Sequence, residues 1–272
     1  MAMTLPYPSS QPDEILEGLQ KKLWIYTNYD CNLRCTYCVA ESSPKSDRRA
    51  LSLDFVINLL DEAQAFGFEQ IYFTGGEPFI LPEIYPMLAY ACERFQTTVL
   101  TNAMLFQGRR LEKLKAIQSE RLTVQVSLDS HQPAGHDPYR GRGSWLRTKQ
   151  GLETLLEIGF RVRLSSTLTP INTGHLDEIC AFHQSLGIPE EDHIVRPLAK
   201  RGLSREGLEV GKHNLAPEIT VNVDGAYWHP LSTDIDLRVC DRVFPLADVV
   251  SQVIAELLVI QEAAQANLKP FQ

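Results

Sequence analysis

Three cysteines lie within eight residues of one another, Cys31, Cys35 and Cys38, directly after the apolar stretch 23–26. Three sulfur ligands on one short loop can bind three irons of an iron–sulfur cluster and leave the fourth iron open for chemistry. A closed zinc site would need a fourth ligand nearby, and the nearest further cysteine is Cys92. A disulfide would leave one of the three unpaired, and the chain shows no secretory signal pattern. The spacing therefore favours an open iron–sulfur cluster.

A second distinctive segment, Thr-Gly-Gly-Glu-Pro at positions 74–78, ends the apolar run 70–73. Because glycine has no Cβ, the pair Gly75 and Gly76 lets the backbone approach a ligand closely. An ordinary turn from a strand into a helix would use the same residues. On its own this segment leaves both interpretations open.

In this order, the two segments resemble the motifs of the radical SAM enzymes. That family has Cys-x3-Cys-x2-Cys with an aromatic residue before the third cysteine, here Tyr37, and a later Gly-Gly-Glu-Pro. The resemblance implies that Cys31, Cys35 and Cys38 bind one 4Fe–4S cluster, whose fourth iron is chelated by S-adenosylmethionine. It also implies reductive cleavage of this cofactor and hydrogen abstraction from a substrate by a 5′-deoxyadenosyl radical.

The same resemblance implies where the cofactor lies. Its methionine amino group is expected against Gly75 and Gly76, and Glu77 is expected to complement the positive charge. The implied cofactor-binding residues are Tyr37, Gly75, Gly76, Glu77, Pro78, Ser127, Asp129, Arg140 and Arg196.

Apolar runs and helical patterns alternate along the chain. Predicted strands cover 22–27, 70–74, 97–101, 122–127, 160–168 and 193–197, and predicted helices cover 53–66, 81–95, 110–118, 145–158 and 175–186. This rhythm indicates an α/β fold of six parallel strands with the helices outside. Radical SAM enzymes have such a partial (β/α)6 barrel of the TIM type.

Reacting groups gather at the carboxyl ends of the strands in barrels of this type. Ser127 and Asp129 end the fourth predicted strand, and the resemblance implies that the serine contacts the carboxylate or ribose of the cofactor. Asp129 has a similar role or caps a turn. The polar segment 129–144 is predicted as a long rim loop, in which either Arg140 or Arg142 would hold the cofactor carboxylate or both would be solvated.

Arg196 lies near the end of the sixth predicted strand and is expected to line the cavity. The backbone around this point reads the adenine in the peptide-modifying and cofactor-making branch of the family, which this segment resembles. The composition shift through 201–212 marks a domain boundary. The predicted division is an N-terminal extension over 1–20, the barrel over 21–202 and a C-terminal segment over 203–272.

The C-terminal segment resembles a reduced SPASM or twitch segment. Residues 219–230 alternate like a hairpin that turns at Asp224–Gly225, and the amphipathic stretch 243–260 predicts a helix that does not span a membrane. The cysteine that the family has after Pro230 is replaced by Leu231, and only Cys240 follows. We therefore expect one cluster, capped by a hairpin and a helix.

The composition predicts an enzyme of the cytoplasm. A hydrophobic share of 44% supports a large core, and a net charge of −8 does not favour nucleic acid as a partner. The family implies flavodoxin or ferredoxin as electron donor. The loop and hairpin patterns favour a ribosomally made peptide as substrate, while small-cofactor biosynthesis, glycyl-radical activation and a non-catalytic role in binding cluster or cofactor stay open.

Overall fold

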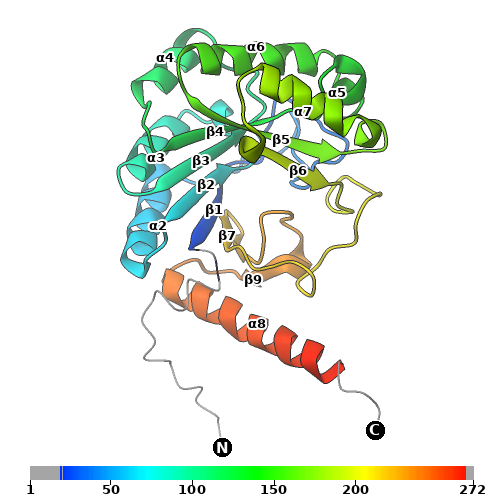
Figure 1. Ribbon diagram of the computed structural model, residues 1–272. Coiled ribbons are helices and arrows are strands. Elements are labelled where there is room, and N and C mark those ends of the chain that lie inside the picture. The colour runs from blue at the N-terminus through cyan, green and yellow to red at the C-terminus, as the bar shows by residue number, and fades with distance from the viewer. Residues whose placement is uncertain (1–18, 20, 268–272) are drawn as a thin grey trace, which may run out of the picture.

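A computed structural model describes Leu19 and residues 21–267 of the chain. The predicted N-terminal extension over 1–20 thus lies outside the described residues except for Leu19. Strands and helices alternate through the first two thirds of the described chain, with one sheet at the centre (Figure 1).

The barrel strands are β1 (Lys22–Tyr26), β2 (Gln70–Thr74), β3 (Gln96–Thr101), β4 (Leu122–Ser127), β5 (Arg161–Leu168) and β6 (His193–Pro197). The helices that follow these strands are α2 (Leu53–Phe66), α3 (Ile84–Cys92), α4 (Gly108–Ala116), α5 (Pro133–Arg140), α6 (Ser144–Glu157) and α7 (Leu176–Ser185). Short 3-10 turns lie at Pro78–Ile80, Thr173–His175, Glu190–Asp192 and Ile235–Leu237.

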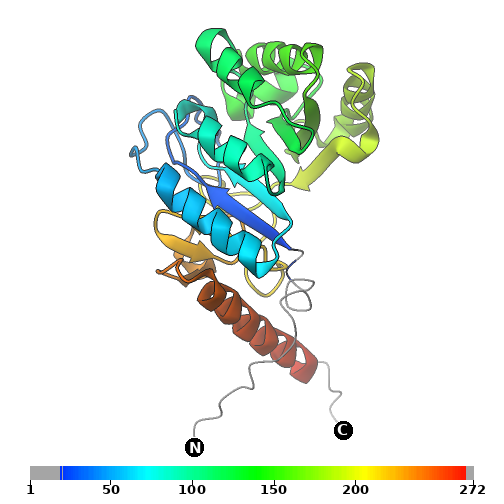
Figure 2. The same cartoon turned by 90° about the vertical axis from the view of Figure 1, so that its left-hand side faces the viewer.

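The sheet runs in the order β6-β5-β4-β3-β2-β1 and continues into three further strands beside β1. Each of the first six strands pairs in parallel with its neighbour, for example Leu23 with Ile71 and Val99 with Val124. Helices α2 to α7 lie on the outer face of this curved sheet (Figures 1 and 2). The predicted α/β fold, an open (β/α)6 barrel, is confirmed.

The three further strands form the predicted C-terminal hairpin and its extension. They are β7 (Thr220–Asn222), β8 (Gly225–Tyr227) and β9 (Arg238–Cys240), and helix α8 (Leu246–Asn267) follows them. Strand β7 pairs in parallel with β1, through Trp24 and Thr220, whereas β8 and β9 pair antiparallel. The hairpin therefore continues the sheet of the barrel, and the division of the chain at residue 202 stays a prediction.

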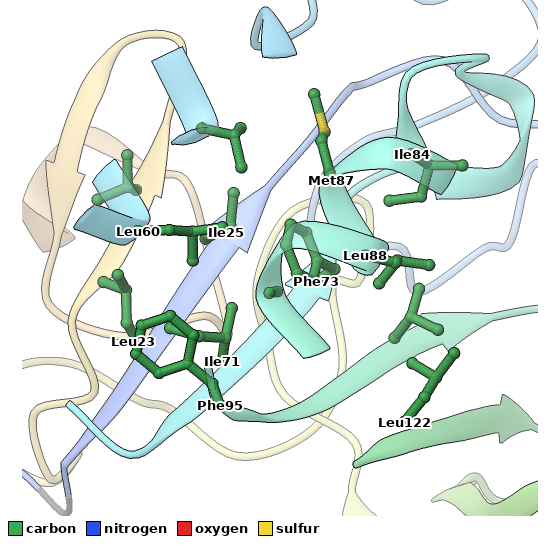
Figure 3. Close-up of a cluster of buried hydrophobic side chains, with 14 of the residues drawn as sticks. Leu23, Ile25, Leu60, Ile71, Phe73, Ile84, Met87, Leu88, Phe95 and Leu122 are labelled. Atoms are coloured by element: carbon green, nitrogen blue, oxygen red, sulfur yellow. The ribbon is translucent and has the colours of Figure 1, made fainter. Parts of the chain in front are cut away.

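The main core lies between the sheet and its outer helices. Apolar side chains of β1 and β2 interdigitate there with those of α2 and α3 (Figure 3). The labelled side chains of this cluster are Leu23, Ile25, Leu60, Ile71, Phe73, Ile84, Met87, Leu88, Phe95 and Leu122. Burial of each such side chain contributes about 1.5–3 kcal/mol, so this layer fixes the strands that carry the site.

Alternate residues of the same strands face the interior of the barrel, because side chains alternate across a strand. Trp24 and Tyr72 stack there with ring centres 4.4 Å apart. The indole N–H of Trp24 donates to Glu218, which precedes β7. This contact ties the hairpin to the barrel interior.

The prediction of a long loop over 129–144 is wrong in its central part, which forms helix α5. Pro133 is the first residue of this helix, where a missing N–H costs nothing. The Asp137 carboxylate accepts hydrogen bonds from the backbone N–H groups of Gly143 (2.7 Å) and Trp145 (2.9 Å), at the start of α6. Few apolar residues mark α5, so its helical period is not visible in the sequence.

The Gly75–Gly76 pair packs directly against the segment that leads from β1 into the cysteines. Gly76 N–H donates to the Asn28 carbonyl (2.8 Å), and Glu77 N–H donates to the Asp30 carbonyl (3.0 Å). A Cβ at Gly76 would lie 2.2 Å from the Asp30 carbonyl oxygen, and Gly75 has a φ of +147°. Glycine is therefore required here by close packing within the protein itself.

We expect Gly76→Ala to lower the free energy of unfolding by roughly 2–3 kcal/mol, because the added methyl group meets backbone that cannot rotate away. The matched control is Gly174→Ala, since a Cβ at Gly174 meets no atom within 4 Å. This control should change stability by less than about 1 kcal/mol. Urea unfolding of both variants measures the difference, and equal midpoints would contradict the packing role of Gly76.

Candidate functional site

The cysteine loop lies at the mouth of the barrel. Cys31, Cys35 and Cys38 line one open cavity of about 1000 Å³, part of which is continuous with solvent. Residues at the carboxyl ends of five strands also line this cavity. They are Thr74, Gly75, Gly76, Glu77, Leu100, Thr101, Asn102, Ser127, Thr167, Arg196 and Pro197.

The three sulfur atoms lie in a partly buried environment with backbone N–H donors close by. Leu33 N–H donates to Cys31 Sγ (3.4 Å) and Ser42 N–H donates to Cys38 Sγ (3.3 Å). Burial raises the pKa of Cys31 and raises the pKa of Cys35 to about 11. A cationic metal centre would reverse this effect by stabilising the thiolates, as metal binding releases protons from its ligands.

The donor set fits an iron–sulfur cluster. All six cysteines are free of disulfide bonds. Within the described residues, no three histidine, cysteine or carboxylate side chains converge closely enough to bind a single metal ion. The three thiols instead surround a shared space, the arrangement in which each sulfur binds a different iron.

Glu77 lies in the cavity wall with only 1% of its surface exposed. Its carboxylate accepts hydrogen bonds from Thr101 Oγ1 (2.8 Å), Asn102 N–H (2.8 Å) and Phe79 N–H (3.2 Å). Burial raises the pKa of Glu77 to about 7. This side chain thus joins the turn after β2 to the end of β3, while Pro78 is buried and does not line the cavity.

Tyr37, Asp129 and Arg140 form one buried polar cluster beside the cysteines. Arg140 donates from Nε (2.7 Å) and Nη2 (3.0 Å) to the two carboxylate oxygens of Asp129. The Tyr37 hydroxyl donates to the same carboxylate (2.5 Å), and its ring lies 5.4 Å from the Arg140 guanidinium carbon. Tyr37 and Arg140 line the cavity, whereas Asp129 lies behind them.

The structure distinguishes the two arginines of the rim segment. Arg140 reaches the cavity, but Arg142 is exposed and does not line it. Ser127 and Arg196 both lie in the cavity wall, and their contact with a cofactor stays a prediction.

Asn102 and Thr167 are among the cavity residues that were not predicted from the sequence. Asn102, which follows β3, donates from Nδ2 to the Asn32 side chain in the cysteine loop (2.8 Å). Thr167 lies near the end of β5 and lines the cavity. Both stand at carboxyl ends of strands, a position that would have identified them.

The C-terminal segment closes one side of the cavity. Leu203 N–H donates to the Cys38 carbonyl (3.0 Å), and the Tyr26 hydroxyl donates to the Pro230 carbonyl (2.5 Å). Leu231, at the position where the family has a cysteine, lines the cavity with an apolar side chain. Cys240 is in β9 and is not part of this lining.

The described part of the chain contains helices α2 to α8. None of them combines the length and the apolar character that crossing a bilayer requires.

Parts of this chain are similar in sequence to known proteins. It is 32% identical over 159 residues to the antilisterial bacteriocin subtilosin biosynthesis protein AlbA of Bacillus subtilis (strain 168), a match that covers 58% of this chain and 35% of that protein. It is 29% identical over 159 residues to the AdoMet-dependent heme synthase of Methanosarcina barkeri, covering 58% and 45%. The chain thus spans less than half of the length of these relatives.

A likeness of fold extends further along the chain. The structure of Streptococcus suis SuiB bound to its precursor peptide SuiA superposes with a TM-score of 0.57 at 22% identity, covering 69% of this chain and 43% of SuiB. The sequence profile of the radical SAM superfamily matches residues 25–184, which is more than half of the chain. This chain belongs to the radical SAM superfamily.

Proposed function

We propose that this protein binds one 4Fe–4S cluster through Cys31, Cys35 and Cys38 and is an enzyme that cleaves S-adenosylmethionine. The observation that carries the proposal is the single cavity that these thiols share with the ends of five parallel strands. When bound, such a cluster would supply the electron for reductive cleavage of S-adenosylmethionine, the chemistry that starts hydrogen abstraction from a substrate.

The protein's own residues bind and orient the cofactor. The backbone of Gly75 and Gly76 would lie against the amino group of the bound cofactor, and Glu77 would add a nearby carboxylate. Ser127 and Arg140 donate to the cofactor carboxylate, since both line the cavity and both are donors. This assignment rests on which polar groups face the same space.

Three further residues complete the cofactor site. Tyr37 and Arg196 line the cavity. The backbone after Arg196 would contact the adenine of the bound cofactor. Pro78 acts through the turn that it begins, because it does not line the cavity.

For the substrate we infer a ribosomally made peptide. This inference is supported by similarity to a bacteriocin biosynthesis protein and by likeness of fold to an enzyme solved with a precursor peptide. A small cofactor is the second candidate, because the heme synthases are similarly close in sequence. A flavodoxin or a ferredoxin serves as electron donor in this proposal.

Anaerobically reconstituted protein, reduced with dithionite and given S-adenosylmethionine, should release 5′-deoxyadenosine. The variant with Cys31, Cys35 and Cys38 all changed to alanine should release none, because it lacks the cluster ligands. Chromatographic quantification of 5′-deoxyadenosine measures both. A reduced cluster whose paramagnetic resonance signal does not respond to S-adenosylmethionine would contradict the proposal.

The single-cluster proposal has its own test. Changing Cys92, Cys180 and Cys240 to alanine should leave iron at about four atoms per chain, because none of these residues lines the cavity. Iron analysis and visible absorbance after reconstitution measure the outcome. Loss of iron relative to the wild type would show that a second cluster or another ligand set is present.

A further inference from the structure

The Asp129 carboxylate is saturated by groups of the protein. Its side chain is fully buried, and each oxygen accepts two hydrogen bonds. Oδ2 accepts from Arg140 Nε and the Tyr37 hydroxyl, while Oδ1 accepts from Arg140 Nη2 and from Thr167 N–H (3.0 Å). A carboxylate offers about four acceptor positions, so none is left for a ligand.

Arg140, in contrast, keeps donors available. A guanidinium has five N–H groups, and Asp129 uses two of them. No hydrogen bond joins the others to any residue that the structure describes, and the side chain lines the cavity. Burial alone would raise the pKa of Asp129, but the Arg140 guanidinium, together with His136 and the hydrogen bond from Tyr37, outweighs burial, and the pKa lies below its ordinary value.

The same carboxylate reaches the cysteine loop. Tyr37 directly precedes Cys38, and its hydroxyl donates to Asp129. A second link joins the same two regions, because Thr36 N–H donates to the Tyr139 carbonyl in α5 (2.8 Å). The loop that carries the thiols and the helix that carries Arg140 are therefore held in one arrangement by the Tyr37–Asp129 and Thr36–Tyr139 hydrogen bonds.

We propose that Asp129 is a positioning residue that couples the cluster loop to the cofactor-carboxylate donor Arg140, without touching the cofactor itself. This inference rests on the proposed function, since it assumes that Arg140 binds the carboxylate of S-adenosylmethionine. It assigns Asp129 a role that differs from direct cofactor contact and from capping a turn. The carboxylate sets the distance and orientation between cluster and cofactor.

Asp129→Asn tests this assignment. The amide retains one oxygen for Thr167 N–H and Arg140 Nη2, but its NH2 group faces two donors, the Tyr37 hydroxyl and Arg140 Nε. The matched control is Asp137→Asn, because Asp137 lies on α5, the helix that carries Arg140. Its carboxylate accepts hydrogen bonds from backbone N–H groups at the start of α6 and does not contact Tyr37 or Arg140.

Titration of the reduced, cluster-loaded proteins with S-adenosylmethionine, followed by the change in the paramagnetic resonance signal, gives the dissociation constant. We expect Asp129→Asn to weaken binding by about tenfold to a hundredfold, the usual effect of losing a residue that orients a ligand-binding group. Asp137→Asn should lower stability in urea and leave the dissociation constant within about twofold of wild type. Equal dissociation constants for the two variants would overturn the inference.

Tyr37→Phe keeps the test decisive if Asp129→Asn does not load a cluster. It removes one hydrogen bond of the carboxylate and retains the ring, so we expect binding to weaken by roughly threefold to tenfold. Wild-type affinity in this variant would overturn the coupling. If the paramagnetic resonance signal of the wild-type cluster does not change on adding S-adenosylmethionine, the proposed function is overturned and this inference with it. If the wild-type signal changes and both variants bind with wild-type affinity, the inference alone is overturned.

Discussion

Two backbone hydrogen bonds join the exits of β1 and β2 at the edge of the cavity. Gly76 N–H and Glu77 N–H donate to the carbonyls of Asn28 and Asp30, and this approach is closed to any residue with a side chain at position 76. The cysteines begin one residue after this junction. Their position relative to the glycine turn therefore follows from parallel pairing of β1 with β2 and from the absence of a Cβ.

Buried polar groups provide the second level of order around the cavity. An isolated buried charge is costly, yet Asp129 and Arg140 are almost fully buried and compensate each other through paired hydrogen bonds. Replacing such a pair with apolar residues often costs no stability, so stability alone does not explain it. A role in orienting Arg140 toward the cavity gives the pair a physical reason.

The C-terminal segment belongs to the same sheet and to the wall of the same cavity. Strand β7 extends the sheet beside β1, and Leu231 and the chain near Cys38 are brought to one side of the cavity. Radical chemistry gains from such closure, because excluding water protects a reactive intermediate. The apolar side chain of Leu231 lines this side of the cavity, at the position where the SPASM or twitch resemblance implies a cysteine.

Local patterns predicted the elements that depend on neighbouring residues. Strands β2, β4 and β6 lie where short apolar runs bounded by turn residues predict them. The spacing of the three cysteines predicts an iron–sulfur cluster. Helix α5, the Asp129–Arg140 pair and the packing of Gly76 on Asp30 depend instead on segments that meet only after folding. Sequence by itself thus determined the fold class, and it predicts the three cysteines as cluster ligands. Only the tertiary structure decided that Asp129 contacts Tyr37 and Arg140 and that Arg140 lines the cavity. The physical reason is that these hydrogen bonds join residues far apart in the sequence, and no local pattern reveals which distant side chains will pair.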